Sequence, residues 1–343
     1  MKLRAQNPPH IRSRETNQTL MNDVLLALLP LYVMAAFYYG IRAIQLALVS
    51  VGICVSLDLL CQIVSRKVPN IRDQSAVVTG LLIPLLMPAA IRWEIVAAAA
   101  VFAIVVVKFP FGGVGQNVFN PAAAGVAFAM VCWPRGMFSY PMPFDRVPWA
   151  IDETVKLVNS PARTLMLEGT PTADLMDMAL GNVPGPMGAT HILVLLSCLL
   201  YLLIRRTIKL SLTMSFFCGA ALVAVIAPRA PVSFEMSVVY ELMSGLLLIG
   251  GIFLINDPVS SPKRGLPKIL YGFLTGVLSM AFRHLGRFEE SLLFAILMMN
   301  AAVWIIDLWG EQLAHTIRRK NGGHKQHQKV QEAAGEHLGN IEE

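Results

Sequence analysis

The sequence predicts an all-α polytopic membrane protein with about ten transmembrane helices, arranged as two inverted halves of five. Hydrophobic residues make up 55% of the 343 residues and charged residues only 15%, whereas soluble domains contain about 25% charged residues. The apolar residues also form long uninterrupted blocks, such as Leu25 to Tyr39 and Ile44 to Val64. A helix needs about 20 such residues to cross a bilayer. Because backbone amides cannot stay unpaired in lipid, the blocks are predicted to be helical.

Each span is placed by the extent of its apolar block. The third span contains Pro84 and Pro88, and the eighth contains Gly245, Gly250 and Gly251. Helix breakers at membrane depth predict broken helices that line a cavity. The ten spans cover roughly residues 22–40, 43–64, 75–90, 94–109, 119–134, 188–204, 209–227, 238–255, 268–283 and 289–309.

The distribution of basic residues predicts the orientation, because cytoplasmic loops carry an excess of Lys and Arg. With a cytoplasmic N-terminus, about two thirds of the 28 Lys and Arg residues lie on the cytoplasmic side. Both termini are therefore predicted to be cytoplasmic. The net charge of +6 is explained by this topology, so it does not indicate nucleic-acid binding. The predicted parts are the N-terminus (1–21), a first five-helix repeat (22–134), an outside loop (135–187), a second five-helix repeat (188–310) and a cytoplasmic tail (311–343).

Short similarities between the two halves favour an internal repeat. An odd number of spans per half gives the halves opposite orientations, which is the plan of many transport folds. The segment 79–82 (Thr-Gly-Leu-Leu) is echoed by 244–247 (Ser-Gly-Leu-Leu), and 120–123 is distantly echoed by 300–303. The repeat predicts that the third and eighth spans flank a central site.

Metal and nucleotide motifs are missing from the sequence. The five cysteines include no pair with C-x-x-C spacing, so this chain alone is not expected to hold an iron–sulfur cluster or a zinc ion. The sequence also lacks a G-x-G-x-x-G fingerprint followed by the expected βαβ pattern, so NAD is expected to bind elsewhere.

A glycine-rich segment, residues 112–122, lies at the predicted cytoplasmic mouth of the fifth span. Its glycines allow close backbone approach to a ligand. Asn117 and Asn120 are three residues apart and would share a face if the helix had already begun. Two amides on one face could bind the carbonyl and N–H groups of a planar heterocycle. The alternative is a glycine-rich turn with an Asn cap before Pro121.

A second segment, residues 185–191, closes the outside loop and opens the sixth span. Thr190 is expected in the first helical turn at the outer boundary. Free N–H groups and the helix dipole favour a phosphate at such a helix N-terminus, so the hydroxyl could carry a phosphoester. The alternative is a helix-capping threonine.

Three acidic residues are candidates for binding or for ion handling. Asp257 ends the eighth span, where the helix dipole disfavours a carboxylate, although an Asp-Pro turn is an alternative. Asp58 lies within the second span and Asp307 near the cytoplasmic end of the tenth. A carboxylate in a bilayer costs about 2.5–3.5 kcal/mol, so both are ion-pathway candidates. Asp58 could instead reach the interface or pair with a neighbouring subunit.

Together these segments resemble the family that contains RnfD and the B subunit of the sodium-pumping NADH:quinone reductase. The resemblance covers about residues 4 to 310 and rests on the order and spacing of its motifs. The length is closer to the D subunits of Rnf-type complexes, because quinone reductase B subunits have a longer N-terminal extension. The matching segments are 73–82 with Pro88, 112–122, 188–190, and Asp257-Pro258 with Ser261-Pro262.

The resemblance implies two flavin sites. In the family, the threonine of a small-residue-Ala-Thr motif carries FMN through a phosphoester, which corresponds to Thr190 after Gly188 and Ala189. Family B subunits also hold non-covalent riboflavin near asparagines that correspond to Asn117 and Asn120. The remaining cofactor-binding candidates implied by the matching segments are Thr79, Gly80 and Asp257.

The resemblance further implies a place in an electron-transport complex. Expected partners are the other Rnf subunits, including a covalent-FMN flavoprotein and iron–sulfur membrane subunits, with a flavin transferase for maturation. Electron transfer between reduced ferredoxin and NAD would be coupled to Na⁺ or H⁺ transport across a bacterial inner membrane. The alternatives are a quinone reductase B subunit and, from another class, a solute channel or permease without a redox cofactor.

Overall fold

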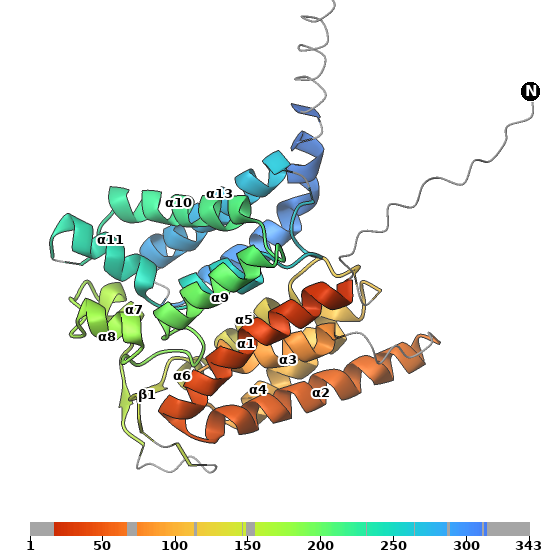
Figure 1. Ribbon diagram of the computed structural model, residues 1–343, viewed down its shortest axis with the longest axis horizontal. Helices are drawn as coiled ribbons and strands as arrows, with labels where there is room; N and C mark the ends of the chain where they lie inside the picture. Colours follow the sequence, from red (N-terminus) through yellow and green to blue (C-terminus); the bar gives the residue numbers. More distant parts are fainter. Residues whose placement is uncertain are drawn as a thin grey trace, which may run out of the picture.

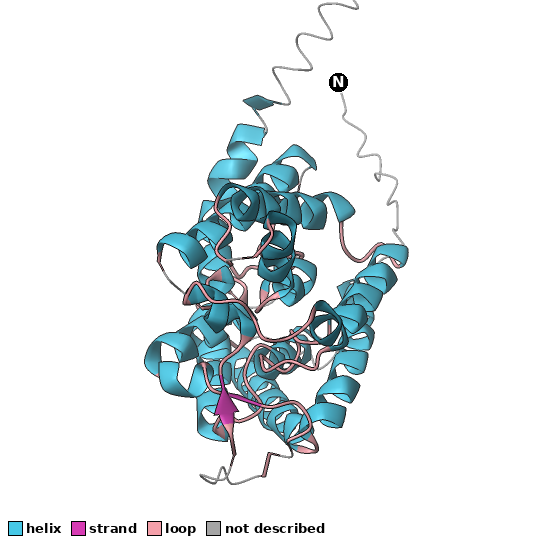
Figure 2. Cartoon of the chain, turned by 90° about the vertical axis from the view of Figure 1, so that its left-hand side faces the viewer, coloured by secondary structure: helices cyan, strands magenta, loops and turns pink. Residues whose placement is uncertain are grey.

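The computed structural model describes residues 17–66, 74–112, 115–145, 147–148, 155–230, 232–263, 265–286, 289–310 and 312–313. Within these residues the chain is almost entirely helical, and the expected all-α class is confirmed. A two-stranded antiparallel ribbon is the exception, in which β1 (Tyr140–Pro141) pairs with β2 (Leu157–Val158). Figure 2 shows this small strand region among the helices. Most of the predicted N-terminus (1–21) and cytoplasmic tail (311–343) lies outside the described residues, as do residues 67–73.

The first half of the chain forms five consecutive helical segments, coloured red to yellow in Figure 1. The fourth combines an α-helix with a π-helical segment, η1, and the fifth begins at a proline that follows an Asn cap. Pro at the first helical position loses no hydrogen bond there. The segments are α1 (Asn17–Tyr39), α2 (Arg42–Val64), α3 (Ser75–Leu85), α4 (Trp93–Val101) with η1 (Phe102–Lys108), and α5 (Pro121–Cys132).

The second half again contains five helical segments, coloured green to blue in Figure 1. Its third segment is broken, because the axes on either side of Ser244 to Leu246 differ by 65°. The predicted broken helix in the eighth span is therefore confirmed. The segments are α9 (Ile192–Ile204), α10 (Leu210–Ile226), α11 (Phe234–Met243) with α12 (Leu247–Ile249) and η2 (Gly250–Leu254), α13 (Gly265–Leu285), and a last helix, Leu292–Gly310.

The segment between the halves contains three short helices at the end of the bundle opposite the start of α1 (Figure 1). The predicted outside loop is thus partly structured. Ser160 caps α7 by accepting a hydrogen bond from the Arg163 backbone N–H. These helices are α6 (Pro134–Met137), α7 (Pro161–Met166) and α8 (Leu175–Leu180).

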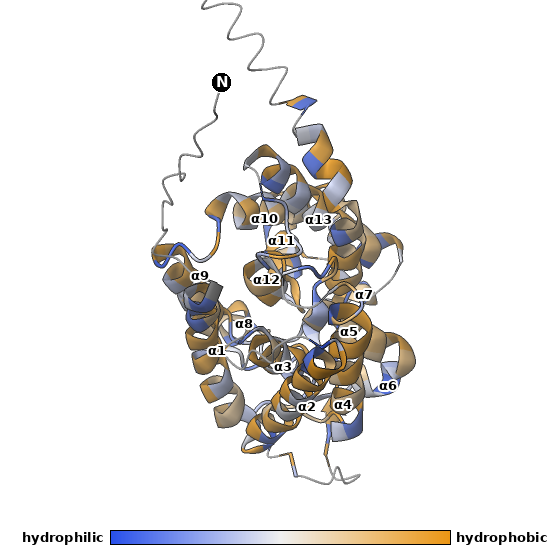
Figure 3. Cartoon of the chain, turned by 90° about the vertical axis from the view of Figure 1, so that its right-hand side faces the viewer, coloured by the Kyte–Doolittle hydropathy of each residue, from blue (hydrophilic) through white to orange (hydrophobic). Residues whose placement is uncertain are grey.

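The helices are suited to lipid as well as to each other. Four described helices are long and apolar enough to cross a membrane, and α11 with α12 and η2 adds a fifth if this bent pair is counted as one span. In α1, Leu29 and Val33 are more than half exposed, whereas Leu28 and Leu31 are fully buried. A helix with apolar residues on both faces places one against protein and the other against lipid. Figure 3 shows hydrophobic residues, coloured orange, along most helices. The chain is a polytopic all-α membrane protein.

Helix boundaries differ from the predicted ones where prolines and turns intervene. The third segment ends at Leu85, because Pro84 lies in its last turn and a turn follows before Pro88. In both halves the second helix contacts the fourth, since α2 packs against α4 and α10 against α13. The inverted relation between the halves remains a prediction.

Candidate functional site

A cavity of about 460 Å³ opens between the two halves, and we call it the interface cavity. Its wall is formed at one end of the bundle, where α1, α3 and α5 begin and where η1, α9 and η2 end. Pockets of about 300–1,000 Å³ are the size that accepts cofactors. Its polar lining residues are Gln18, Gln74, Ser75, Thr79, Lys108, Asn117, Asn120, Thr207, Asn256, Asp257 and Lys263.

Asn117 and Asn120 both line the interface cavity, but not as neighbours on a helix. The helix begins at Pro121, so the shared helical face is not present. Asn120 is the N-cap, because its Oδ1 accepts from the Ala123 N–H at 3.1 Å. Its Nδ2 donates to the Leu254 carbonyl at 3.2 Å and thereby joins the two halves. The Asn-cap interpretation of this motif is confirmed, and Asn120 has structural bonds in addition to its place in the cavity wall.

Asn117 is held less firmly than Asn120. Its Nδ2 donates to the Phe119 carbonyl at 3.1 Å, while the residue is buried in the cavity wall. Its amide is therefore better placed than that of Asn120 to exchange an internal bond for a ligand. Gly113 and Val114 of the same motif lie outside the described residues.

Thr79 and Gly80 face different neighbours. Thr79 lines the cavity while its hydroxyl donates to the Ser75 carbonyl at 2.9 Å. A Cβ on Gly80 would lie 2.7 Å from the Val51 Cα, so Gly80 permits close contact between α3 and α2. The predicted ligand-binding role of Gly80 is not matched by its position, because the glycine faces a helix instead of the cavity.

Asp257 lies in the cavity wall just after η2. Its Oδ2 accepts from the Ser260 hydroxyl at 2.6 Å and its Oδ1 from the Val259 N–H at 3.4 Å. These bonds form the Asp-Pro turn that was the alternative interpretation. Burial nevertheless raises the pKa of the Asp257 carboxyl.

The cavity also contains a cation that the sequence motifs did not indicate. The Lys108 ammonium lies 2.9 Å from Asp58 Oδ1 and donates to the Ser75 hydroxyl at 2.8 Å. Gln62 donates to the other oxygen of Asp58 at 2.8 Å. Asp58 is therefore paired within the chain, behind Lys108, and does not reach the cavity wall itself. A lone lysine ending an apolar run was the available sequence signal.

Asp307 is separate from the interface cavity and from the surroundings of Thr190. It is half-buried on the last helix. It lines neither the interface cavity nor the pocket around Thr190. An ion path through this residue would therefore run apart from both candidate flavin sites.

Thr190 lies at the opposite end of α9 from the interface cavity. It precedes the helix by two residues, so the expected place in the first helical turn was wrong; the N-cap is His191. Since α9 has 13 residues, the two ends are about 20 Å apart at 1.5 Å per residue.

The Gly188-Ala189-Thr190 segment is fastened to the first half. Gly188 N–H donates to the Leu85 carbonyl at 2.8 Å, and Met187 N–H to the Met87 carbonyl at 3.0 Å. A Cβ on Gly188 would lie 2.7 Å from the Leu85 Cβ, so only glycine allows this approach. The backbone before Thr190 is thereby fixed on the end of α3.

The Thr190 side chain is only 5% exposed and its Oγ1 has no hydrogen-bond partner. Buried hydroxyls usually have a partner, so an unpaired one suggests an absent group. We call its small cavity of about 20 Å³ the Thr190 pocket. This volume holds about one water, so any larger group attached to the hydroxyl would extend out of the pocket. The pocket is lined by Ser160, Pro161, Met178, Val183, Pro184, Gly185, Pro186, Ala189, Thr190, Met243, Ser244 and Gly245.

The fold and these sites define a polytopic membrane protein with a cofactor-sized cavity between two helical halves and a buried, unpaired threonine at the opposite end. A model of the NQR2, RnfD, RnfE family matches residues 4–314, and the chain belongs to this family.

Similar proteins are named as D subunits of ion-translocating complexes. The chain is 29% identical to the D subunit of the Na⁺-translocating ferredoxin:NAD⁺ oxidoreductase complex of Acetobacterium woodii, over 93% of this chain and 97% of that protein. It is also 29% identical to its counterpart in the proton-translocating complex of Clostridium ljungdahlii, over 91% and 95%. It is 25% identical to the D subunit of the ion-translocating oxidoreductase complex of Psychromonas ingrahamii, over 91% and 98%.

Proposed function

We propose that this chain is the D-type membrane subunit of an ion-translocating ferredoxin:NAD⁺ oxidoreductase complex, with FMN esterified to Thr190. Similarity to relatives of that name over nearly their whole length supports the placement. The observation that carries the FMN assignment is the buried Thr190 hydroxyl without a hydrogen-bond partner. Esterification would break no existing side-chain bond at this position.

A flavin dinucleotide can serve as the donor of the FMN that is transferred to Thr190, with all atoms accounted for. The Thr190 oxygen forms a bond to the flavin phosphorus, and the pyrophosphate bond of the donor breaks. A nucleoside monophosphate leaves, and the hydroxyl proton is released. A flavin transferase on the outer face would provide this reaction. Bound FMN supplies the electron-accepting and electron-donating chemistry, while the chain fixes the tether through Gly188 and Met187.

The interface cavity is proposed to hold a second, non-covalent flavin. Its volume of about 460 Å³ is in the range for cofactor pockets. Asn117 and Thr79 offer an amide and a hydroxyl, and the Lys108 ammonium, paired with Asp58, lies in the same wall. The chain would thus carry electrons between its outer and inner ends.

Ion coupling is proposed to use charge moved across the bilayer, which is worth about 2.3 kcal/mol per charge per 100 mV. Asp58, Asp257 and Asp307 remain the ion-pathway candidates, for Na⁺ or H⁺. Asp58 is already neutralised by Lys108, so a cation could bind it only if that pair opened.

The proposed location is a bacterial inner membrane with both termini in the cytoplasm. The interface cavity then faces the cytoplasm, and Thr190 faces outward, where the flavin transferase works. The proposed partners are the other Rnf subunits, including a covalent-FMN flavoprotein and iron–sulfur membrane subunits, because this chain has no NAD fingerprint of its own.

Fluorescence of the denatured chain in a gel tests the proposal. We expect a fluorescent wild-type band, none after Thr190→Val, and a retained signal after Thr190→Ser, which keeps a hydroxyl. A mass spectrum of the peptide spanning 185–205 should show the mass of esterified FMN. A colourless wild-type chain would contradict the proposal and favour a permease. Dependence of the purified complex on quinone instead of ferredoxin would favour the quinone reductase B subunit.

A further inference from the structure

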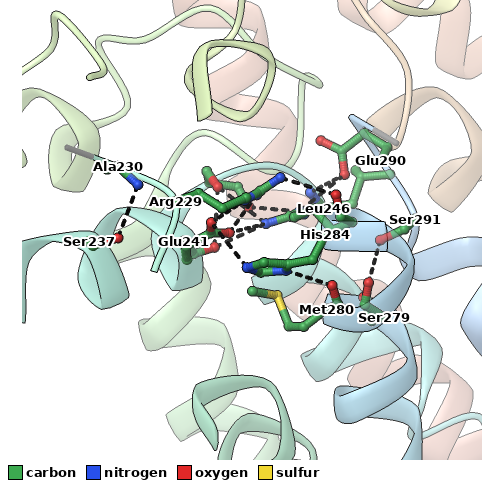
Figure 4. A network of polar contacts seen from close by, with 12 residues as sticks. Arg229, Ala230, Ser237, Glu241, Leu246, Ser279, Met280, His284, Glu290 and Ser291 are labelled. Carbon is green, nitrogen blue, oxygen red and sulfur yellow. Dashed lines mark hydrogen bonds and ion pairs between the residues drawn. The ribbon is translucent and has the colours of Figure 1, made fainter. Parts of the chain in front are cut away.

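A buried charged network surrounds the break between α11 and α12. Figure 4 shows Arg229, Glu241, His284 and Glu290 converging there from separate parts of the second half. Arg229 Nη2 donates to Glu241 Oε2 at 2.7 Å. Arg283 lies 3.7 Å from both Glu241 and Glu290 and is fully buried. The charges pair with each other, so the network can remain ionised away from water.

The network binds the backbone groups that the helix break leaves unpaired. Arg283 donates to the Glu241 carbonyl at 3.1 Å and to the Ser244 carbonyl at 3.4 Å. Glu290 Oε2 accepts from the Leu246 N–H at 2.9 Å. Broken membrane helices persist only where such freed groups find partners inside the protein. Glu290 and Arg283 therefore fix the conformation of this break.

Gly245 allows the carboxylate to come this close. Its φ is +66°, a region that favours glycine. A Cβ at this position would overlap Glu290 Oε1. The break and the Glu290 side chain are therefore fitted to each other.

The next residue toward the N-terminus, Glu289, holds a different segment. Its Oε1 accepts from the Ser160 hydroxyl at 2.5 Å, and its Oε2 lies 3.6 Å from Arg163. Both partners belong to the cap and first turns of α7. Glu289 therefore fastens the segment between the halves, as Glu290 fastens the helix break.

These two segments form walls of the Thr190 pocket. Ser160 and Pro161 contribute one wall, and Ser244 and Gly245 contribute another. The geometry points to Glu289 and Glu290 as positioning residues for flavin attachment, which hold these walls around the Thr190 hydroxyl. This inference rests on the proposed covalent flavin and adds the residues that shape its site.

Covalent flavin per chain in the purified complex tests this role, with the flavin transferase co-expressed. We expect Glu290→Ala and Ser160→Ala to reduce fluorescence per chain about tenfold, because a displacement of about 1 Å can slow a reaction about 100-fold. Glu290→Gln should restore the signal, since an amide oxygen can still accept from Leu246.

Asp23 provides a matched control at the other end of the bundle. This carboxylate is 5% exposed and pairs with Arg205 at 3.0 Å, so Asp23→Ala also removes a buried acid from an ion pair. We expect Asp23→Ala to keep full covalent flavin. If Glu290→Ala does not accumulate in the membrane, the covalent flavin measured in Ser160→Ala tests the positioning role on its own.

The outcomes separate the two levels of the proposal. A wild-type chain without covalent flavin would overturn the proposed function and this inference together. A fluorescent wild type with fully loaded Glu290→Ala and Ser160→Ala would overturn only the positioning role. Equal losses in Glu290→Ala, Glu290→Gln and Asp23→Ala would also overturn it, since the effect would then be general destabilisation.

Discussion

The Asp58 carboxylate lies 2.9 Å from the Lys108 ammonium, and both side chains are almost completely buried within the bundle. The pair joins α2 to the end of η1 and places a lysine in the wall of the interface cavity. A carboxylate that looks isolated on its own apolar segment is thus neutralised by a residue 50 positions away.

Removing one member of this pair should destabilise the protein strongly. We expect Asp58→Leu to lower the free energy of unfolding by about 3–5 kcal/mol, because the buried Lys108 ammonium would lose its counter-ion. The double variant Asp58→Leu/Lys108→Met should recover most of the loss. Thermal unfolding of the purified complex measures both, and equal melting temperatures for the two variants would contradict the pairing.

The two asparagines of the cavity should respond differently to substitution. Asn117→Leu should remove the non-covalent flavin that denaturant releases from the purified complex, with little change in stability. Asn120→Ala should instead cost about 1 kcal/mol through loss of the α5 cap. Released flavin and melting temperature are measured for each. Retention of the released flavin in Asn117→Leu would argue against the cavity as its site.

Close packing of α10 against α13 depends on Gly276. A Cβ there would overlap the Phe216 carbonyl oxygen, so Gly276→Ala should cost about 1–3 kcal/mol through overpacking. Gly52→Ala is the control, because a Cβ on Gly52 meets nothing within 4 Å. That variant should be neutral or slightly stabilising, since alanine favours a helix. Thermal unfolding compares them, and similar effects of both would contradict the packing.

His191 should make stability depend on pH. Burial lowers its pKa to about 4, while the unfolded chain has a pKa of about 6.5. Between these values the unfolded state binds a proton that the folded state does not, so stability falls as pH drops from about 6.5 to 4. The expected loss is about 3 kcal/mol at about 1.4 kcal/mol per pKa unit.

His191→Phe is the matching variant, since its ring can still contact that of Tyr38, whose centroid lies 4.5 Å from the centroid of the His191 ring. Melting temperatures between pH 4 and pH 7 should vary less in this variant than in the wild type. Parallel profiles for the two proteins would show that His191 does not titrate as described.

The sequence by itself determined the helical membrane fold, the broken eighth span and the three segments of interest. These follow from local properties, because apolar blocks must form helices in lipid and glycine or proline must interrupt them. The local pattern singled out Thr190, Asn117 and Asn120, whereas their flavin roles came from the resemblance to a known family. The pattern left open whether Asn120 and Thr190 are helix caps, and only Asn120 is one.

Only the tertiary structure decided which residues meet. Lys108 with Asp58, and Glu290 with the Leu246 N–H, are 44 or more positions apart, and no periodicity in a single segment encodes such a contact. The unpaired state of the Thr190 hydroxyl is likewise a property of its surroundings. Burial and side-chain hydrogen bonding depend on how the helices pack. The backbone hydrogen bonds of a membrane helix, in contrast, form within each segment.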